Sequence, residues 1–352
     1  MPDIAPEFVV FQGGFRDSPE WGSAAVLNPA WLASWYGALG PAKESLATAR
    51  RYVDYLLSRR NATTGLLDYG LGDWKSLVPT PMGVTATGIL VQDLQALSSI
   101  SERLGMPSAA ANYSRLAKDA AGAYTANFWN GSAYPAQTAA GMALTLNMTS
   151  AGDVEQAQAS LVADVLARGN VTTGADIGNR YILQALGHAR GGADALWSSL
   201  LRTSSPGYGF AVAQNETALP ESWNDDPSAS HIHAMLGHVD EYLYAHVAGL
   251  RQAAGDAGWR HVAIQPRPAA ELTWVNCSFE APSGRFELAW QRKVRAAESE
   301  EGVEAEEDFV LLVTLPVGTM ADVILPLEGA KETRLVGAGG PQELRATGTR
   351  LQ

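Results

Sequence analysis

At 352 residues, with 46% hydrophobic and 18% charged residues, the chain has the composition of a globular protein with one large domain or two ordinary ones. A formal net charge of −12 leaves no basic excess, so neither nucleic acid nor an anionic membrane surface is expected as a partner. The single cysteine, Cys277, excludes an intrachain disulfide framework, and no Cys/His spacing indicates zinc, so no metal or other cofactor is expected. Neutral substrates such as sugars are compatible with this composition.

Helical periodicity dominates the first 254 residues. The segment 41–60 places Leu46, Ala49, Val53 and Leu56 three or four positions apart, as on one face of a helix. The same pattern predicts helices at 28–40, 84–105, 110–129, 138–148, 153–169, 179–190, 193–202 and 231–254. Short turns alternate with longer loops, as helical hairpins arranged in a ring require. The sequence therefore predicts a mainly α fold over residues 1–256, with helical hairpins arranged in a ring.

The pattern changes at about residue 258. Short runs of β-branched and apolar residues follow, bounded by turn signals at 282–284 and 316–318. They predict strands at 261–267, 272–282, 284–294, 309–316 and 320–326. We interpret residues 257–352 as an antiparallel β-sandwich domain, and the acidic run at 298–308 as a solvated hairpin loop.

Asparagine is concentrated in N-x-S/T sequons, which are acceptors for N-glycosylation. Chance would place about one or two sequons in a chain of this composition. Seven of the eleven asparagines lie in one: Asn61, Asn112, Asn130, Asn147, Asn170, Asn215 and Asn276. This density favours a secreted glycoprotein, although residues 1–15 lack the basic and apolar regions of a signal peptide. We therefore expect either that the chain is a fragment or that its true start lies upstream; a coincidental density of sequons is the alternative.

Three loops combine tryptophan with carboxylates, at Trp21, at Asp73 and Trp74, and at Glu221 and Trp223. Aromatic faces stack on the C–H surfaces of sugars, and carboxylates accept hydrogen bonds from sugar hydroxyls. One such pair alone usually reflects packing. Their joint occurrence in loops between helices favours a sugar site.

Three histidines, His231, His233 and His238, precede or begin the last predicted helix. A metal site is disfavoured, because His233 lies off the helix face shared by the other two and no carboxylate completes a ligand set. The helix dipole disfavours a charged imidazole in a first turn. A neutral His233 could therefore form a hydrogen bond with a sugar hydroxyl, and a purely structural histidine is the alternative.

Four stretches together resemble the α-L-rhamnosidases of glycoside hydrolase family 78. They are residues 5–29, the GLGDW motif at 70–74, the ESW motif at 221–223 with 230–250 after it, and 258–268 with the following strands. The resemblance covers almost the whole chain. It implies an (α/α)6 barrel followed by a β-sandwich. It also implies hydrolysis of terminal α-L-rhamnosyl residues, from glycosides or polysaccharides, with inversion.

The resemblance also implies roles for individual residues. Glu221 matches the general base that activates water, and His233 matches a histidine that contacts the sugar near that base. The residues implied to bind substrate are His233, Trp21, Trp74, Asp73 and Trp223.

One motif of the family has no match. Its general acid lies in a D-x-P-x-R-x-E-x-x-G-W motif that belongs ahead of the barrel segment with which this chain begins. An inverting glycosidase needs an acid and a base, with carboxyl groups roughly 6.5–9.5 Å apart. The resemblance thus implies a barrel without its first helices, and a chain that could be inactive alone. A catalytically dead carbohydrate-binding protein and another toroid enzyme, such as a different glycosidase or a polysaccharide lyase, remain alternatives.

Overall fold

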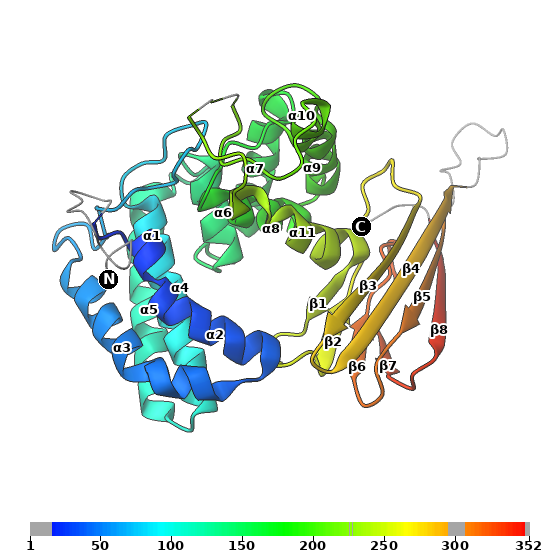
Figure 1. Ribbon diagram of the computed structural model, residues 1–352, viewed down its shortest axis with the longest axis horizontal. Coiled ribbons are helices and arrows are strands. Elements are labelled where there is room, and N and C mark those ends of the chain that lie inside the picture. The colour runs from blue at the N-terminus through cyan, green and yellow to red at the C-terminus, as the bar shows by residue number, and fades with distance from the viewer. Residues whose placement is uncertain (1–15, 225, 227, 295–306, 349–352) are drawn as a thin grey trace. The chain divides into compact units, whose positions relative to one another are not determined.

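The structure is a computed structural model that describes residues 16–224, 226, 228–294 and 307–348 (Figure 1). The start of the first resembling stretch, 5–15, and most of the acidic run 298–308 lie outside the described residues. The chain divides into two compact units. The first comprises Met1–Ala33 and Ala38–Val239, and the second comprises Ser34–Gly37 and Asp240–Gln352. The division therefore falls at Val239, earlier in the chain than the expected boundary at 256.

The first unit is helical. Its elements are α1 (Pro19–Gly22), α2 (Ala24–Tyr36, with its last residues in the second unit), α3 (Leu39–Ser58), α4 (Val84–Arg103), α5 (Pro107–Phe128), α6 (Gln137–Thr145), α7 (Val154–Ala167), α8 (Gly178–His188), α9 (Gly192–Leu201), α10 (Tyr208–Ala213) and the short 3-10 helix η2 (Ala234–Leu236). The sequence predicted the existence of every helix from α2 to α9. Helices α1 and α10 are too short to show a periodicity of their own.

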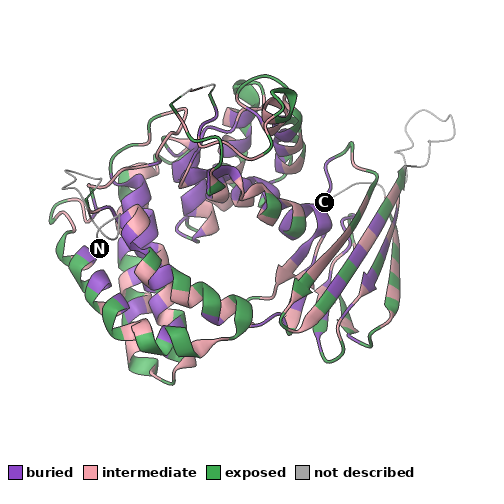
Figure 2. Ribbon diagram, in the orientation of Figure 1, coloured by how far each residue is buried: buried purple, intermediate pink, exposed green. Residues whose placement is uncertain are grey.

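Buried and half-exposed helices alternate along the chain. Helices α4, α6 and α8 are buried over most of their lengths, whereas α3, α5 and α7 bury one face each (Figure 2). Such inner and outer helices are what a toroid of helical hairpins requires. The predicted fold class, a mainly α toroid of helical hairpins followed by a β-sandwich, is confirmed.

Small residues set the spacing of neighbouring helices. On α5 the buried residues Ala110, Tyr113, Ala117, Ala120 and Tyr124 repeat every three or four positions, and this face packs against α4. On α6 a Cβ atom at Gly141 would lie only 2.8 Å from the backbone nitrogen of Ile182 in α8. Glycine is therefore needed there, because the two inner helices cross in backbone contact. Among the described residues no helix combines the length and apolarity needed to cross a bilayer.

The second unit contains two four-stranded sheets, with strand orders β1-β2-β6-β7 and β3-β4-β5-β8. The strands are β1 (Leu250–Gln252), β2 (His261–Ile264), β3 (Trp274–Ala281), β4 (Gly284–Val294), β5 (Glu307–Thr314), β6 (Met320–Val323), β7 (Thr333–Val336) and β8 (Pro341–Gly348). The expectation of a wholly antiparallel sandwich was wrong in one pair, because β2 and β6 run parallel. The aromatic side chains of Phe286, Trp290 and Phe309 are at most 1% exposed and form the centre of this core.

One residue of the acidic run is not solvated. The Glu307 carboxylate accepts two hydrogen bonds of 2.7 Å from the Arg292 guanidinium, and both side chains are largely buried. This bidentate pair holds β4 and β5 together where they approach the acidic run.

The long helix predicted over 231–254 was wrong. The chain forms η2, a short helix α11 (Val239–Tyr242), a π-helical segment η3 (Leu243–Ala248) and then strand β1. The apolar residues that suggested a helix are used differently, since Val247 in η3 and Leu250 in β1 are buried in the second unit whereas Ile232 is 80% exposed. Trp290, for example, donates its indole N–H to the carbonyl of Val247 at 3.0 Å. Tertiary packing therefore decides the conformation of this segment, and the boundary between the units moves with it.

Candidate active site around Glu221

Glu221 lies in a loop whose two sides are joined by backbone hydrogen bonds. The N–H of Glu221 donates to the carbonyl of Ser230 at 2.8 Å, and the N–H of His233 donates to the carbonyl of Leu219 at 2.8 Å. The Ser230 N–H in turn donates to Oε2 of Glu221 at 3.0 Å. The loop therefore positions both the backbone and the carboxylate of Glu221.

The other carboxylate oxygen is held by the GLGDW loop. The indole N–H of Trp74 donates to Oε1 of Glu221 at 3.3 Å. Next to it, Lys75 forms an ion pair with Asp226 at 3.1 Å, and its ammonium lies 5.8 Å from the centre of the Trp74 ring. Two loops distant in sequence thus converge on one carboxylate.

The surroundings of Glu221 favour its charged form. Its pKa is lowered, chiefly by the hydrogen bond from the Ser230 N–H. Burial, the next largest effect, raises it, and the Trp74 N–H and the charges of His233 and Lys75 lower it further. Glu221 is consequently ionised at neutral pH. A partly exposed, ionised carboxylate is able to accept a proton from water.

Asp73, which the resemblance implied as a substrate residue, is an anchor in this structure. It is 6% exposed. Its Oδ1 accepts from the N–H groups of Ile177 and Gly178 at 3.1 and 2.9 Å, and its Oδ2 accepts from the Thr138 hydroxyl at 2.6 Å. The carboxylate therefore caps the N-terminus of α8, where backbone N–H groups have no partner within the helix. It fixes the position of Trp74, its neighbour in the chain, and a direct role with substrate stays a prediction.

Asp176 is a carboxylate of the site that the sequence analysis missed. Its N–H donates to the carbonyl of Trp74 at 3.2 Å. Its pKa is raised, mainly by burial and also by the charges of Asp73 and Glu221, whereas His233 lowers it. Asp176 and Glu221 thus have pKa values shifted in opposite directions within one site. The only signal in the sequence is an aspartate two residues before helix α8.

His233 begins η2 and has a defined tautomer. Its Nδ1 accepts a hydrogen bond of 3.1 Å from the N–H of Met235, so in the neutral ring the proton lies on Nε2. The Nε2–H group can donate to a ligand. The other two histidines have separate partners, since His231 pairs with Glu216 at 3.0 Å and Nδ1 of His238 lies 3.2 Å from the carbonyl of Met235.

The remaining tryptophans of the prediction have different surroundings. Trp223 is 4% exposed, donates its indole N–H to the carbonyl of Gly174 at 2.6 Å, and packs with Ala175 and Met235. It anchors the Glu221 loop against the segment that carries Asp176, and a sugar would have little of its ring to stack on.

Trp21 is partly exposed on α1 and follows Glu20. The Glu20 carboxylate accepts from the Thr85 hydroxyl at 2.6 Å and from the N–H of Gly72 at 3.2 Å. Burial raises the pKa of Glu20. Glu20 therefore ties the helix that carries Trp21 to the GLGDW loop, and contact of Trp21 with substrate stays a prediction.

Comparisons with known proteins find similar chains over almost the whole length of this one. The chain is 27% identical over 341 residues to an alpha-L-rhamnosidase of Streptomyces avermitilis, covering 93% of this chain and 31% of that protein. It is 21% identical to an alpha-L-rhamnosidase of Formosa agariphila, covering 95% of this chain and 36% of that protein. The chain therefore spans about a third of the length of these relatives.

Solved structures show the same fold. The alpha-L-rhamnosidase of Aspergillus terreus superposes with a TM-score of 0.81 at 24% identity, over 92% of this chain and 38% of that one. The Streptomyces avermitilis alpha-L-rhamnosidase complexed with L-rhamnose superposes with a TM-score of 0.79 at 25% identity, over 93% of this chain and 33% of that one. Family models match in two consecutive parts. Residues 1–247 match the bacterial alpha-L-rhamnosidase 6-hairpin glycosidase domain, and residues 249–339 match the bacterial alpha-L-rhamnosidase C-terminal domain. The chain belongs to the bacterial α-L-rhamnosidase family and contains its six-hairpin glycosidase and C-terminal domains.

Proposed function

We propose that the protein hydrolyses terminal α-L-rhamnosyl residues of glycosides or polysaccharides by inversion, with Glu221 as the general base. The observation that carries this proposal is the ionised Glu221 carboxylate, whose two oxygens are held by Trp74 and Ser230 beside His233. Membership of the α-L-rhamnosidase family supports the choice of sugar.

In the proposed reaction, Glu221 takes a proton from a water molecule while the water oxygen attacks the anomeric carbon. The bond from this carbon to the leaving oxygen breaks, and that oxygen takes up a proton. Each carboxylate oxygen has a second lone pair, so the hydrogen bonds from Trp74 and Ser230 leave Glu221 able to accept this proton. The Nε2–H of His233 is the donor available to a sugar hydroxyl.

The proton for the leaving oxygen is a separate question, because the acid motif of the family has no match in residues 1–352. Asp176 is the carboxyl group beside Glu221 whose pKa is raised, so it retains its proton to higher pH than an ordinary aspartate. The Trp74 ring and the Glu221 carboxylate would also serve a second candidate function, in which the chain binds a rhamnose-containing ligand without cleaving it.

The test compares the protein with its Glu221→Gln and Asp176→Asn variants on p-nitrophenyl α-L-rhamnoside, and measures L-rhamnose binding by calorimetry. Removal of a general base lowers turnover by about 10²–10⁴-fold. Turnover that Glu221→Gln abolishes supports the proposal. A much larger loss in Asp176→Asn on a rhamnoside with an alcohol leaving group than on the p-nitrophenyl substrate identifies Asp176 as the proton donor, because p-nitrophenolate leaves without protonation. Binding without turnover favours the second candidate. Neither binding nor turnover would overturn both.

We also propose that the protein is secreted and carries N-linked glycans. Supporting this, five sequon asparagines are exposed, at Asn112, Asn130, Asn147, Asn215 and Asn276. Expression in a eukaryotic secretory host should give a protein that loses mass on digestion with peptide N-glycosidase F. Secretion without such a loss would contradict the glycan assignment.

A further inference from the structure

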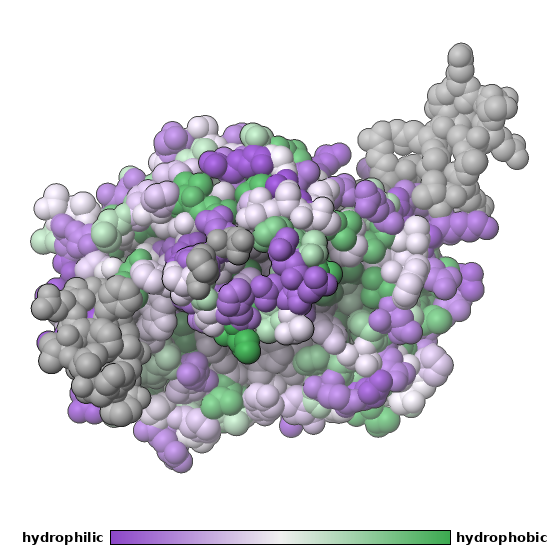
Figure 3. Space-filling view, turned by 45° about the horizontal axis from the view of Figure 1, so that its top comes forward, coloured by the Kyte–Doolittle hydropathy of each residue, from purple (hydrophilic) through white to green (hydrophobic). Residues whose placement is uncertain are grey.

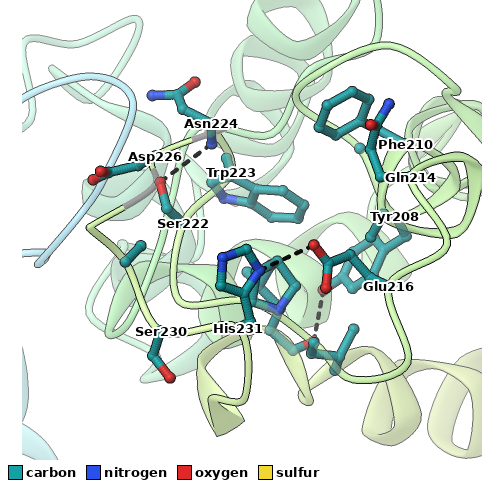
Figure 4. A pocket seen from close by; sticks show the side chains of 16 residues that line it. Tyr208, Phe210, Gln214, Glu216, Ser222, Trp223, Asn224, Asp226, Ser230 and His231 are labelled. Atoms are coloured by element: carbon teal, nitrogen blue, oxygen red, sulfur yellow. Dashed lines mark hydrogen bonds and ion pairs between the residues drawn. The ribbon is translucent and has the colours of Figure 1, made fainter.

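A second concave site lies beside the Glu221 loop, between α10 and the segment 219–236 (Figure 4). Its cavity volume is about 130 Å³. Glu221, Trp74 and Asp176 do not line it. A cavity needs roughly 10–15 Å³ to hold one water molecule, so this one has room for a ring-sized ligand.

Aromatic side chains form part of its wall. Tyr208 and Phe210 come from α10, and Trp223 comes from the Glu221 loop. The rings of Tyr208 and Trp223 meet edge to face with centroids 5.2 Å apart. The Tyr208 hydroxyl donates to the carbonyl of Leu236 at 2.8 Å, which fixes this ring. The wall is therefore rigid and apolar, and Phe210 is a partly exposed ring within it.

Polar groups surround these rings. Figure 4 shows the side chains of Gln214, Glu216, Asn224 and His231 around the cavity. The side-chain amides of Gln214 and Asn224 are exposed, and no hydrogen bond to either amide is present in the described part of the chain. Each amide offers two donors and one acceptor to a ligand.

Both carboxylates that line the cavity have side-chain partners. Glu216 pairs with His231 at 3.0 Å, and Asp226 pairs with Lys75 at 3.1 Å. An anionic ligand would meet two carboxylates, and a cationic ligand would compete with the existing partners. Figure 3 shows one face of the molecule, on which hydrophilic and hydrophobic residues are interspersed. The partly exposed rings of Phe210 and Tyr208, backed by the buried Trp223, and the two amides suit a neutral, hydroxyl-rich ring.

We propose that this cavity is a second binding site, specific for a neutral monosaccharide unit and separate from the Glu221 site. Ser230 adjoins both sites, because it lines the cavity while its N–H holds the Glu221 carboxylate. The inference does not depend on hydrolysis, since none of the reacting groups lies in the cavity.

Tryptophan indole resonances can report the two sites separately. We would record ¹H–¹⁵N spectra of the ten tryptophans during titration with L-rhamnose, D-glucose, D-galactose and D-glucuronate. At least one neutral sugar should shift the Trp223 resonance, and glucuronate should not. The Trp74 resonance reports the Glu221 site, so failure of the proposed function is recognised independently.

Variants on α10 test whether the cavity causes the shift. Phe210→Ala should weaken binding at this site about fivefold, as loss of an aromatic contact does. Gln214→Ala, at an exposed position, should also weaken it without affecting folding. Val212→Ala is the matched control, because Val212 is 75% exposed on the same helix and does not line the cavity. The inference is overturned if no neutral sugar shifts Trp223 up to its solubility limit, if glucuronate shifts it equally, or if folded Phe210→Ala and Gln214→Ala proteins bind as tightly as the control.

Discussion

The indole N–H of Trp74 donates a hydrogen bond of 3.3 Å to Oε1 of Glu221, a residue 147 positions further along the chain. This contact joins the GLGDW loop to the loop of the proposed base. It also lowers the pKa of Glu221. Among the contacts that lower this pKa, only the hydrogen bond from the Ser230 N–H has a larger effect.

Trp74→Phe should therefore raise the pKa of Glu221 while keeping an aromatic ring in the site. A base works only when ionised, so activity falls as the pH drops through its pKa. In the variant this fall should occur at higher pH. The measurement is the pH profile of kcat/KM, with Trp129→Phe at the end of α5 as the control. An unchanged acidic limb would contradict the role of the indole N–H.

Two substitutions of His233 separate its two nitrogens. His233→Asn keeps an acceptor for the Met235 N–H and removes the Nε2–H, so it should raise KM about tenfold with little change in stability. His233→Gln offers an N–H near the position of Nε2 and loses the acceptor. His233→Gln should therefore lower Tm more than His233→Asn does, and raise KM less. The same change in Tm and the same change in KM in both variants would contradict separate roles for the two ring nitrogens.

Asp73→Asn tests the cap on α8. The amide keeps one acceptor oxygen but turns an NH2 group toward backbone donors, so we expect a loss of about 3 kcal/mol in the free energy of unfolding. Asp68→Asn is the control, because Asp68 is exposed in the same loop and accepts one hydrogen bond from Asn61. Urea denaturation of both variants measures the difference. Similar midpoints for the two would exclude an anchoring role.

Asp176→Asn should stabilise the protein at neutral pH. Burial raises the pKa of Asp176 in the folded state, so the folded protein holds this proton more tightly than the unfolded chain does. The contribution of Asp176 to stability therefore falls as the pH rises from the ordinary aspartate pKa through the raised one. The difference in Tm, variant minus unmodified protein, should accordingly be more positive at pH 7 than at pH 4. A constant difference at both pH values would show that the shift is absent.

Asn147 has a backbone role apart from any glycan. It follows the C-cap of α6 with φ of 55°, in the left-handed region that favours glycine and asparagine. Asn147→Gly should leave stability within about 0.5 kcal/mol, whereas Asn147→Val should cost about 1–2 kcal/mol. Thermal melts of unglycosylated protein decide this without interference from glycosylation.

The turn geometry offers a second explanation for asparagine at three of the seven predicted glycosylation sites. Asn147, Asn170 and Asn215 all have positive φ values. Asparagine is therefore favoured at these positions by the backbone alone. A sequence cannot separate this preference from selection for glycosylation.

The helices were predictable where burial repeats with the helical period. Helix α4 buries residues along nearly its whole length and was located to within two residues at its end. Strand β8 was missed, because exposed and half-buried residues alternate along it without a buried apolar face. The segment after His233 was mispredicted since one apolar stripe serves a π-helical turn and a strand in succession.

The proposed site was predictable in part. Trp74 and Glu221 lie in the GLGDW and ESW motifs and were predicted from them, and the structure brings the two residues into contact. The anchoring of Asp73 was not predictable, because its four N–H and O–H donors come from segments 65 to 105 residues away. Asp176 carries no motif, and its raised pKa arises from burial that only the folded chain creates.

The two backbone hydrogen bonds that close the Glu221 loop, Glu221 to Ser230 and His233 to Leu219, lie at its base and not at its tip. Loop-closure entropy grows only slowly with length, so added residues beyond such a closure cost little. The stretch between Trp223 and Ser230 can therefore lengthen or shorten while the carboxylate keeps its place. A change of loop length there would alter the rim of the site and leave the proposed reacting groups in place.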